Sequence, residues 1–173
     1  MSRPPPLQRL SVGVVIERRR ARSAWVDFVW RPVAALPGTP DTQPWTVLDQ
    51  NAQVTTFYAG AAEVALFASG TEFYKENLAS GEPSLWVVLR PTGVDPPFDV
   101  LAVTADPTEG EAFTQAGDDL VEPVPMPLPI REALEGFVKE HHVDTAFVKR
   151  KRDKADPEAL ARRAPVAKGD ADE

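Results

Sequence analysis

Ser84-Leu85-Trp86-Val87-Val88-Leu89-Arg90 is the most hydrophobic run of this 173-residue chain, and it decides the fold. A short apolar run rich in β-branched and aromatic residues is typical of a strand that is covered on both faces. Residues 91–93 and 96–97, which contain proline and glycine, indicate a turn directly after it. Residues 98–104 are therefore predicted to return as its antiparallel hairpin partner.

Alternating apolar residues upstream of this hairpin predict five more strands. The clearest lies at residues 10–16, where Leu, Val, Val and Ile occupy every second position. The others are expected at 26–30, 45–48, 54–58 and 60–67. Pro32 and the proline- and glycine-containing stretch 37–40 are expected to end the second of these strands in a loop.

Helices are predicted downstream of the hairpin. Asp106 is suited to cap a helix with Pro107 at its first position and Glu109 at the third, and Gly117 is expected to end it. Alternate prolines from 123 to 129 favour an extended, polyproline-like approach to a second helix at about 129–142. One stripe of that helix is apolar enough to pack on the strands.

We therefore expect an α+β fold that is mainly β: a strongly bent antiparallel sheet or a small barrel, with a C-terminal helix packed on it. The domain organisation follows from composition. Residues 1–8 are expected to be a disordered, proline-rich arm, and residues 9–148 a single β-rich domain. Residues 149–173 are expected to be a tail that is first basic and then disordered.

Charge is unevenly distributed along the chain. Residues 1–31 hold seven arginines and two acids, whereas residues 32–148 hold four basic and eighteen acidic residues. Residues 149–173 are again basic, with eight basic and six acidic residues. Such segregation favours a protein that binds a partner, and the acidic centre argues against a general nucleic-acid surface.

Composition also excludes several classes of site. The chain has no cysteine, which removes disulfides, thiolate metal sites, iron–sulfur clusters and cysteine nucleophiles. Residues 1–6 lack the apolar core of a signal peptide, and no apolar run approaches the roughly 20 residues that span a membrane. We expect a cytoplasmic protein without a membrane segment.

Two groups of residues are candidate sites of chemistry. His141 and His142 are adjacent on the predicted helix and point about 100° apart, so they are poorly placed to grip one metal ion. The segment 70–78 brings together Glu72, Tyr74, Lys75 and Asn77. Its carboxylate, phenol and amine have acid–base capacity, but no paired nucleophile or oxyanion donor accompanies them. With no phosphate loop or nucleophile elbow either, we expect no enzyme activity, no metal site and no cofactor.

Two basic spots remain as candidate binding sites. One follows the predicted domain and consists of Phe147, Lys149, Arg150, Lys151 and Arg152. It is open to three interpretations: a solvated tail, a contact for phosphate groups, or a dock on an acidic protein with Phe147 as an apolar anchor. The other lies at the end of the first predicted strand and consists of Arg18, Arg19 and Arg20, with Arg22 close by.

Several stretches together resemble an uncharacterised bacterial family whose members are encoded beside the genes of molybdenum-dependent formate dehydrogenase. The resemblance spans about residues 10–163. Its most specific part is the succession of Pro-Met-Pro at 125–127, His-His at 141–142 and Phe-Val-Lys-Arg-Lys-Arg at 147–152. The other matching stretches are Ser11-Val12-Gly13-Val14-Val15-Ile16-Glu17-Arg18-Arg19, Ala24-Trp25-Val26-Asp27-Phe28-Val29-Trp30-Arg31-Pro32-Val33, Glu72-Phe73-Tyr74-Lys75-Glu76-Asn77-Leu78 and Trp86-Val87-Val88-Leu89-Arg90.

The resemblance implies a role in the assembly or maturation of formate dehydrogenase, or in association with the finished enzyme. The expected function is that of a non-catalytic accessory protein, with a formate dehydrogenase subunit or a maturation factor as its partner. Two alternatives stay open: a barrel that binds a small ligand or a cofactor intermediate, and a nucleic-acid-binding protein that uses the basic tail. An open sheet edge would also allow a homodimer.

Overall fold

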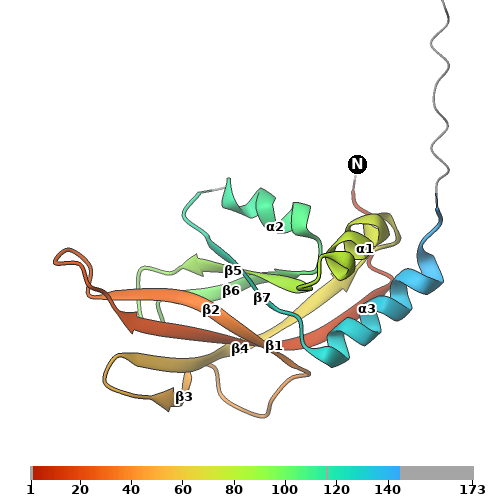
Figure 1. The fold of residues 1–173 in the computed structure, drawn as a ribbon. Coiled ribbons are helices and arrows are strands. Elements are labelled where there is room, and N and C mark those ends of the chain that lie inside the picture. Colours follow the sequence, from red (N-terminus) through yellow and green to blue (C-terminus); the bar gives the residue numbers. More distant parts are fainter. Residues whose placement is uncertain (1, 116, 145–173) are drawn as a thin grey trace, which may run out of the picture. The chain divides into compact units, whose positions relative to one another are not determined.

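Two antiparallel sheets form the framework of the protein (Figure 1). The computed structural model describes residues 2–115 and 117–144. The larger sheet has four strands, and its longest two, β1 and β4, lie side by side in the middle. In their order across the sheet, the strands are β2 (Phe28–Pro37), β1 (Gln8–Arg20), β4 (Val54–Leu66) and β3 (Thr46–Gln50).

The smaller sheet contains the hydrophobic run at 84–90. This run forms β5, which lies between its two partners and is the central strand, as the sequence predicts. The strands of this sheet, again in order, are β6 (Phe98–Thr104), β5 (Ser84–Pro91) and β7 (Leu120–Pro125).

The core lies between the two sheets, where β4 contacts β6 and β2 contacts β7. Alternate residues of β1 and β5 contribute many of its fully buried side chains, because successive residues of a strand point to opposite faces. These side chains are Val12, Val14 and Ile16 of β1 and Leu85, Val87 and Leu89 of β5. The mainly β, α+β prediction is confirmed; the sheets are not closed into a barrel, so only the open form of the two expected arrangements is found.

Among the described residues, three α-helices pack on this framework or on one another: α1 (Thr71–Ala79), α2 (Pro107–Thr114) and α3 (Leu128–His141). A 3₁₀ turn, η1 (Ala68–Gly70), leads into α1. Helix α2 lies on the outer face of β5, and its Gly110 leaves room for the indole of Trp86. Its cap is the predicted one, since Asp106 accepts hydrogen bonds from the N–H groups of Thr108 and Glu109. The C-terminal helix α3 buries Ile130, Leu134 and Phe137 in the core, and α1 packs against it.

The structure differs from the predicted strands at three places that contain proline or glycine. Strand β2 continues through Pro32 to Pro37, because Pro32 sits beside a bulge on an edge strand, where a missing N–H is tolerated. Residues 54–66 form one strand with a register shift opposite Gly60, where two strands were expected. Part of the alternate-proline stretch is β7, an edge strand of the smaller sheet and no polyproline segment.

Residues 2–115 and 117–142 belong to one unit of the chain, which includes the segment expected to be an arm. Within that segment the Arg3 guanidinium lies 3.6 Å from the centre of the Phe67 ring and pairs with Glu109 at 3.2 Å. No helix among residues 2–115 and 117–144 is long and apolar enough to cross a membrane.

Candidate functional site

The hairpin that joins β1 to β2 ends in a tip at residues 21–27, at the end of the sheets away from α1 and α3 (Figure 1). The N–H of Ala21 donates to the carbonyl of Asp27 at 3.0 Å and closes the tip. Trp25 projects from it with 93% of its surface exposed, and Val26 and Val29 are about half exposed. We call this region, residues 17–31 with the neighbouring β3–β4 turn, the hairpin end.

Strand geometry separates the consecutive arginines of β1 onto opposite faces. Arg18 lies on the face toward the other sheet, where its guanidinium carbon is 4.6 Å from the ring centre of Phe28 and 5.4 Å from that of Phe57. Its Nη2 also lies 3.4 Å from the hydroxyl of Thr55. Arg18 therefore covers the edge of the core and serves the fold.

An aromatic cluster lies beneath Arg18. Trp30 stacks on Phe57 with ring centres 5.8 Å apart, and Phe98 of the other sheet meets Trp30 edge-on at the same distance. Trp45 packs against both Trp30 and Phe57. Edge-to-face and offset pairs of this kind add roughly 0.5–1.5 kcal/mol each beyond simple burial. The cluster gives the hairpin end a fixed base.

Arg19 lies on the opposite face, where it shares a carboxylate with Arg31 of β2. Register places Arg31 directly across from Glu17. Glu17 Oε1 is 3.1 Å from Arg19 Nε and 3.4 Å from Arg31 Nη2. Only 13% of the Glu17 side chain is exposed, whereas each arginine is about half exposed. One carboxylate thus orients two guanidinium groups at the surface.

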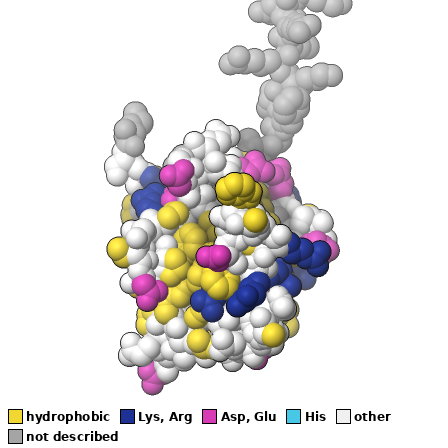
Figure 2. All heavy atoms as spheres, turned by 90° about the vertical axis from the view of Figure 1, so that its left-hand side faces the viewer, with side chains coloured by type: hydrophobic (Ala, Val, Ile, Leu, Met, Phe, Trp, Pro, Cys, Tyr) yellow, Lys and Arg dark blue, Asp and Glu magenta, His cyan; other side chains and the backbone are white. Residues whose placement is uncertain are grey.

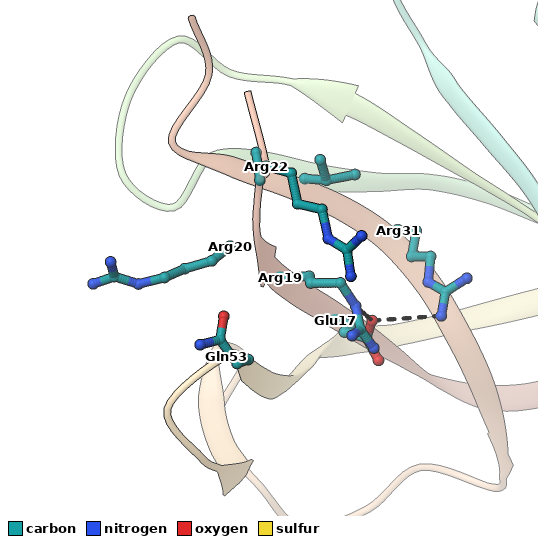
Figure 3. A pocket seen from close by; sticks show the side chains of 8 residues that line it. Glu17, Arg19, Arg20, Arg22, Arg31 and Gln53 are labelled. Carbon is teal, nitrogen blue, oxygen red and sulfur yellow. Dashed lines mark hydrogen bonds and ion pairs between the residues drawn. The ribbon is translucent and has the colours of Figure 1, made fainter. Parts of the chain in front are cut away.

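These side chains line an open depression of about 540 Å³. In Figure 3 the side chains of Arg19, Arg22 and Arg31 gather around Glu17, while Arg20 points away from it. Ala21, Val29 and Gln53 complete the lining. The lining contains four arginines and one glutamate, a surplus of three positive charges, although only three of the arginines gather around the glutamate. We call this depression the arginine pocket.

Figure 2 shows this end of the molecule face-on. Basic side chains form a band along one side of it, and hydrophobic side chains gather beside the band. Surface of this composition combines charge for orientation with apolar area that a partner would cover.

The predicted site residues are only partly described by the structure. Of Arg18, Arg19 and Arg20, the last two line the arginine pocket, and Arg18 and Arg20 line a smaller depression of about 120 Å³ on the other face. Phe147, Lys149, Arg150, Lys151 and Arg152 lie outside the described residues. Arg31 was missed, although a hairpin centred near residue 24 would have placed it opposite Glu17.

Two of the candidate side chains in segment 70–78, Tyr74 and Asn77, are buried and make hydrogen bonds within the fold. Asn77 is 3% exposed; its Nδ2 donates to the carbonyls of Ser84 and Ala105, and its Oδ1 accepts from the N–H of Ser84. The Tyr74 hydroxyl accepts from the N–H of Phe67 at 3.1 Å, and burial raises the pKa of this phenol. Both side chains hold helix α1 to its surroundings.

The two histidines likewise sit beside packing partners. The His141 ring centre is 4.5 Å from that of Phe137. His142 Nδ1 is 3.1 Å from the Thr71 hydroxyl, and its Nε2 is 3.6 Å from a carboxylate oxygen of Glu72. Among residues 2–115 and 117–144, no three His, Asp or Glu side chains are grouped so that they could hold a metal ion.

The family model described as "Protein of unknown function (DUF3305)" matches residues 11–151, which is most of the chain. The chain belongs to this family. No curated protein and no solved structure matches it.

Proposed function

We propose that this protein is a non-catalytic accessory protein that binds another protein through its hairpin end. The observation that carries the proposal is the exposure of Trp25 beside a surplus of arginines. Tryptophan and arginine are the residue types that most often dominate the binding energy of protein interfaces. An indole at a loop tip, 93% exposed, contributes little to the fold that holds it.

The free energy that burial of the Trp25 indole would release supports a role for this residue in binding. Burial of a tryptophan removes about 150–250 Å² from water. At about 25 cal/mol per Å² this corresponds to roughly 4–6 kcal/mol before the costs of association. The surrounding arginines would add orientation and a faster encounter with an acidic partner, since complementary charge acts mainly on the association rate.

We propose as partner a subunit of molybdenum-dependent formate dehydrogenase or one of its maturation factors. This identity rests on the resemblance to a family encoded beside the genes of that enzyme. The positive charge of the hairpin end favours an acidic surface on the partner. The exposed indole of Trp25 favours an apolar recess within that surface. The basic run of Phe147, Lys149, Arg150, Lys151 and Arg152 is proposed as a second contact.

The test is recovery of dehydrogenase components on tagged protein from cells that make the enzyme, quantified by mass spectrometry. Trp25→Ala is expected to lower the recovery about tenfold or more, as for an interface hot spot. The matched control is Leu128→Ala, because Leu128 is also apolar and exposed, at 63%, but begins helix α3. The free energy of unfolding of both variants is expected to lie within about 0.5 kcal/mol of that of the wild type.

Two results would contradict the proposal. If the wild type recovers no dehydrogenase component, the proposed partner is wrong. If Trp25→Ala and Leu128→Ala lower the recovery equally, the hairpin end is not the binding site. Exchange of Lys149, Arg150, Lys151 and Arg152 for glutamate tests the second contact separately, and an unchanged recovery rejects that contact alone.

A further inference from the structure

We propose that the arginine pocket is a binding site for a multiply charged phosphate group, such as pyrophosphate or the phosphate chain of a nucleotide. This site goes beyond the proposed function, because it requires no protein partner and none of the exposed apolar surface of Trp25. The argument rests on the charge, the free donors and the dimensions of the pocket.

Charge in the pocket differs from charge elsewhere on the protein. Arg9, Arg90 and Arg131 each pair with one carboxylate, at 3.2, 2.9 and 3.0 Å. In the pocket, four arginines line a cavity with the single carboxylate of Glu17. Like charges gathered in this way repel one another, and an anion that enters would relieve the repulsion. The surplus of three positive charges suits a ligand with two or more negative charges.

Hydrogen-bond donors remain available after the internal pairing. A guanidinium has five N–H donors in a planar fork. Glu17 Oε1 engages Nε of Arg19 and Nη2 of Arg31, which leaves other N–H groups of both side chains for a ligand. Arginine is the side chain best matched to phosphate, because its fork donates two parallel hydrogen bonds.

The pocket is also held in shape before any ligand arrives. Arg19 and Arg31 lie on neighbouring strands, and the mostly buried Glu17 fixes both. The N–H of Arg20 donates to the carbonyl of Gln53 at 3.0 Å, which ties the β3–β4 turn to the end of β1. Preorganised donors lose less conformational freedom on binding.

The dimensions fit a small molecule. A volume of about 540 Å³ lies within the range of roughly 300–1,000 Å³ that is usual for ligand sites. The methyl groups of Ala21 and Val29 offer a limited apolar wall beside the arginines. A lone carboxylate would leave most of the charge surplus uncompensated, so the pocket favours a diphosphate.

The experiment is titration calorimetry of the purified full chain at low ionic strength, with pyrophosphate, inorganic phosphate and ADP as separate ligands. We expect pyrophosphate to bind with a Kd of about 1 mM or tighter, and inorganic phosphate more weakly because it carries less charge. ADP that binds more tightly than pyrophosphate would identify a nucleotide as the source of the phosphate group, and equal affinities would identify a free diphosphate.

Variants separate the pocket from bulk electrostatics. The double variant Arg22→Gln/Arg31→Gln is expected to bind pyrophosphate about tenfold more weakly, because each lost guanidinium removes charge-assisted hydrogen bonds. The control Arg9→Gln/Arg131→Gln lowers the net charge equally but alters arginines outside the pocket. Arg22→Gln alone leaves Glu17 with both partners and is expected to weaken binding about threefold.

Several results would overturn the proposal. One is that none of the three ligands binds the wild type. Another is that the control variant and the pocket variant lose affinity for pyrophosphate equally. A single-stranded oligonucleotide that binds far more tightly than pyrophosphate, with affinity that falls steeply with salt, would assign the arginines to nucleic acid instead. Trp25→Ala is expected to bind pyrophosphate like the wild type, so this test and the partner test fail independently.

Discussion

The two ends of the sheets differ in whether their polar side chains are buried within the protein or exposed at its surface. At the end that carries α1 and α3, the buried amide of Asn77 and the hydroxyl of Tyr74 bond to backbone groups within the protein. At the hairpin end, four arginines and only one carboxylate line the same pocket, and Trp25 is exposed to solvent. The first arrangement stabilises the fold, whereas the second leaves charge and apolar area for something else to cover.

The comparison shows that residues with chemical capacity need not form a site. The tyrosine, glutamate, lysine and asparagine of segment 70–78 are close in sequence, yet α1 turns Tyr74 and Asn77 inward and leaves Glu72 at the surface. Glu17 and Arg31 are distant in sequence, yet strand pairing brings them into contact. The two cases differ in exposure, since Tyr74 and Asn77 are buried whereas Arg19 and Arg31 are about half exposed.

The largest expected effect is that of Asn77→Ala. It removes three hydrogen bonds in the interior and leaves backbone groups of Ser84 and Ala105 without this partner. We expect the free energy of unfolding to fall by about 3 kcal/mol or more, measured by urea denaturation.

Asn51→Ala is the matched control at the hairpin end. Asn51 Oδ1 accepts from the N–H groups of Gln53 and Val54, but water can replace it there because the residue is exposed. We expect this change to cost about 1 kcal/mol or less. Equal losses from the two substitutions would remove the distinction between the ends.

Tyr74→Phe is expected to cost about 1–2 kcal/mol, because the N–H of Phe67 loses its acceptor while the ring contact with Phe137 is kept. Tyr58→Phe serves as control: its ring is equally buried, but its hydroxyl makes no hydrogen bond within the described residues. A thermal or urea melt in which the two variants lose the same stability would contradict the assigned role of the Tyr74 hydroxyl.

Arg18→Gln tests whether one arginine of the hairpin end belongs to the fold. Arg18 lies over the aromatic cluster, and we expect its loss to lower the free energy of unfolding by about 1 kcal/mol. Arg22→Gln is expected to change it by less than about 0.5 kcal/mol. If urea denaturation shows a larger loss of stability for Arg22→Gln than for Arg18→Gln, the assignment of Arg18 to the fold is wrong.

The smallest effect concerns the pH dependence of stability. Hydrogen bonds from Arg90 lower the pKa of Asp119, and the two side chains meet at 2.9 and 3.0 Å. A carboxylate with a lowered folded pKa stabilises the protein above its ordinary pKa of about 4, and this stabilisation is lost as pH falls through the folded value.

Arg90→Gln should therefore flatten the dependence of the urea midpoint on pH below about pH 4. Arg131→Gln, which removes an exposed pair with Glu135 on one helix, provides the comparison. An unchanged pH profile in Arg90→Gln would show that the pair contributes nothing measurable.

The sequence predicted the fold where a single physical rule applied. The hydrophobic run at 84–90 is the central strand, and the cap at Asp106 begins α2, because a hydrophobic run and a helix cap can each be recognised from neighbouring residues. Proline rules misled at Pro32 and in the stretch that became β7, since an edge strand tolerates proline and edge position depends on long-range pairing. The register that brings Arg31 to Glu17 is equally long-range.

The candidate site was predicted in part for the same reason. The basic run at 18–20 was visible in the sequence, but its division between two faces depends on where the strand is placed in the sheet. The functional role of either basic spot stays a prediction.

Trp25 has a consequence for spectroscopy. Its indole is almost fully hydrated, whereas Trp30, Trp45 and Trp86 are each partly shielded. Its fluorescence should lie at the red edge of the emission spectrum and should be quenched first by acrylamide. The protein thus contains a native optical reporter at the tip of the hairpin, and a macromolecule that covers the tip would shift this emission to the blue without any added dye.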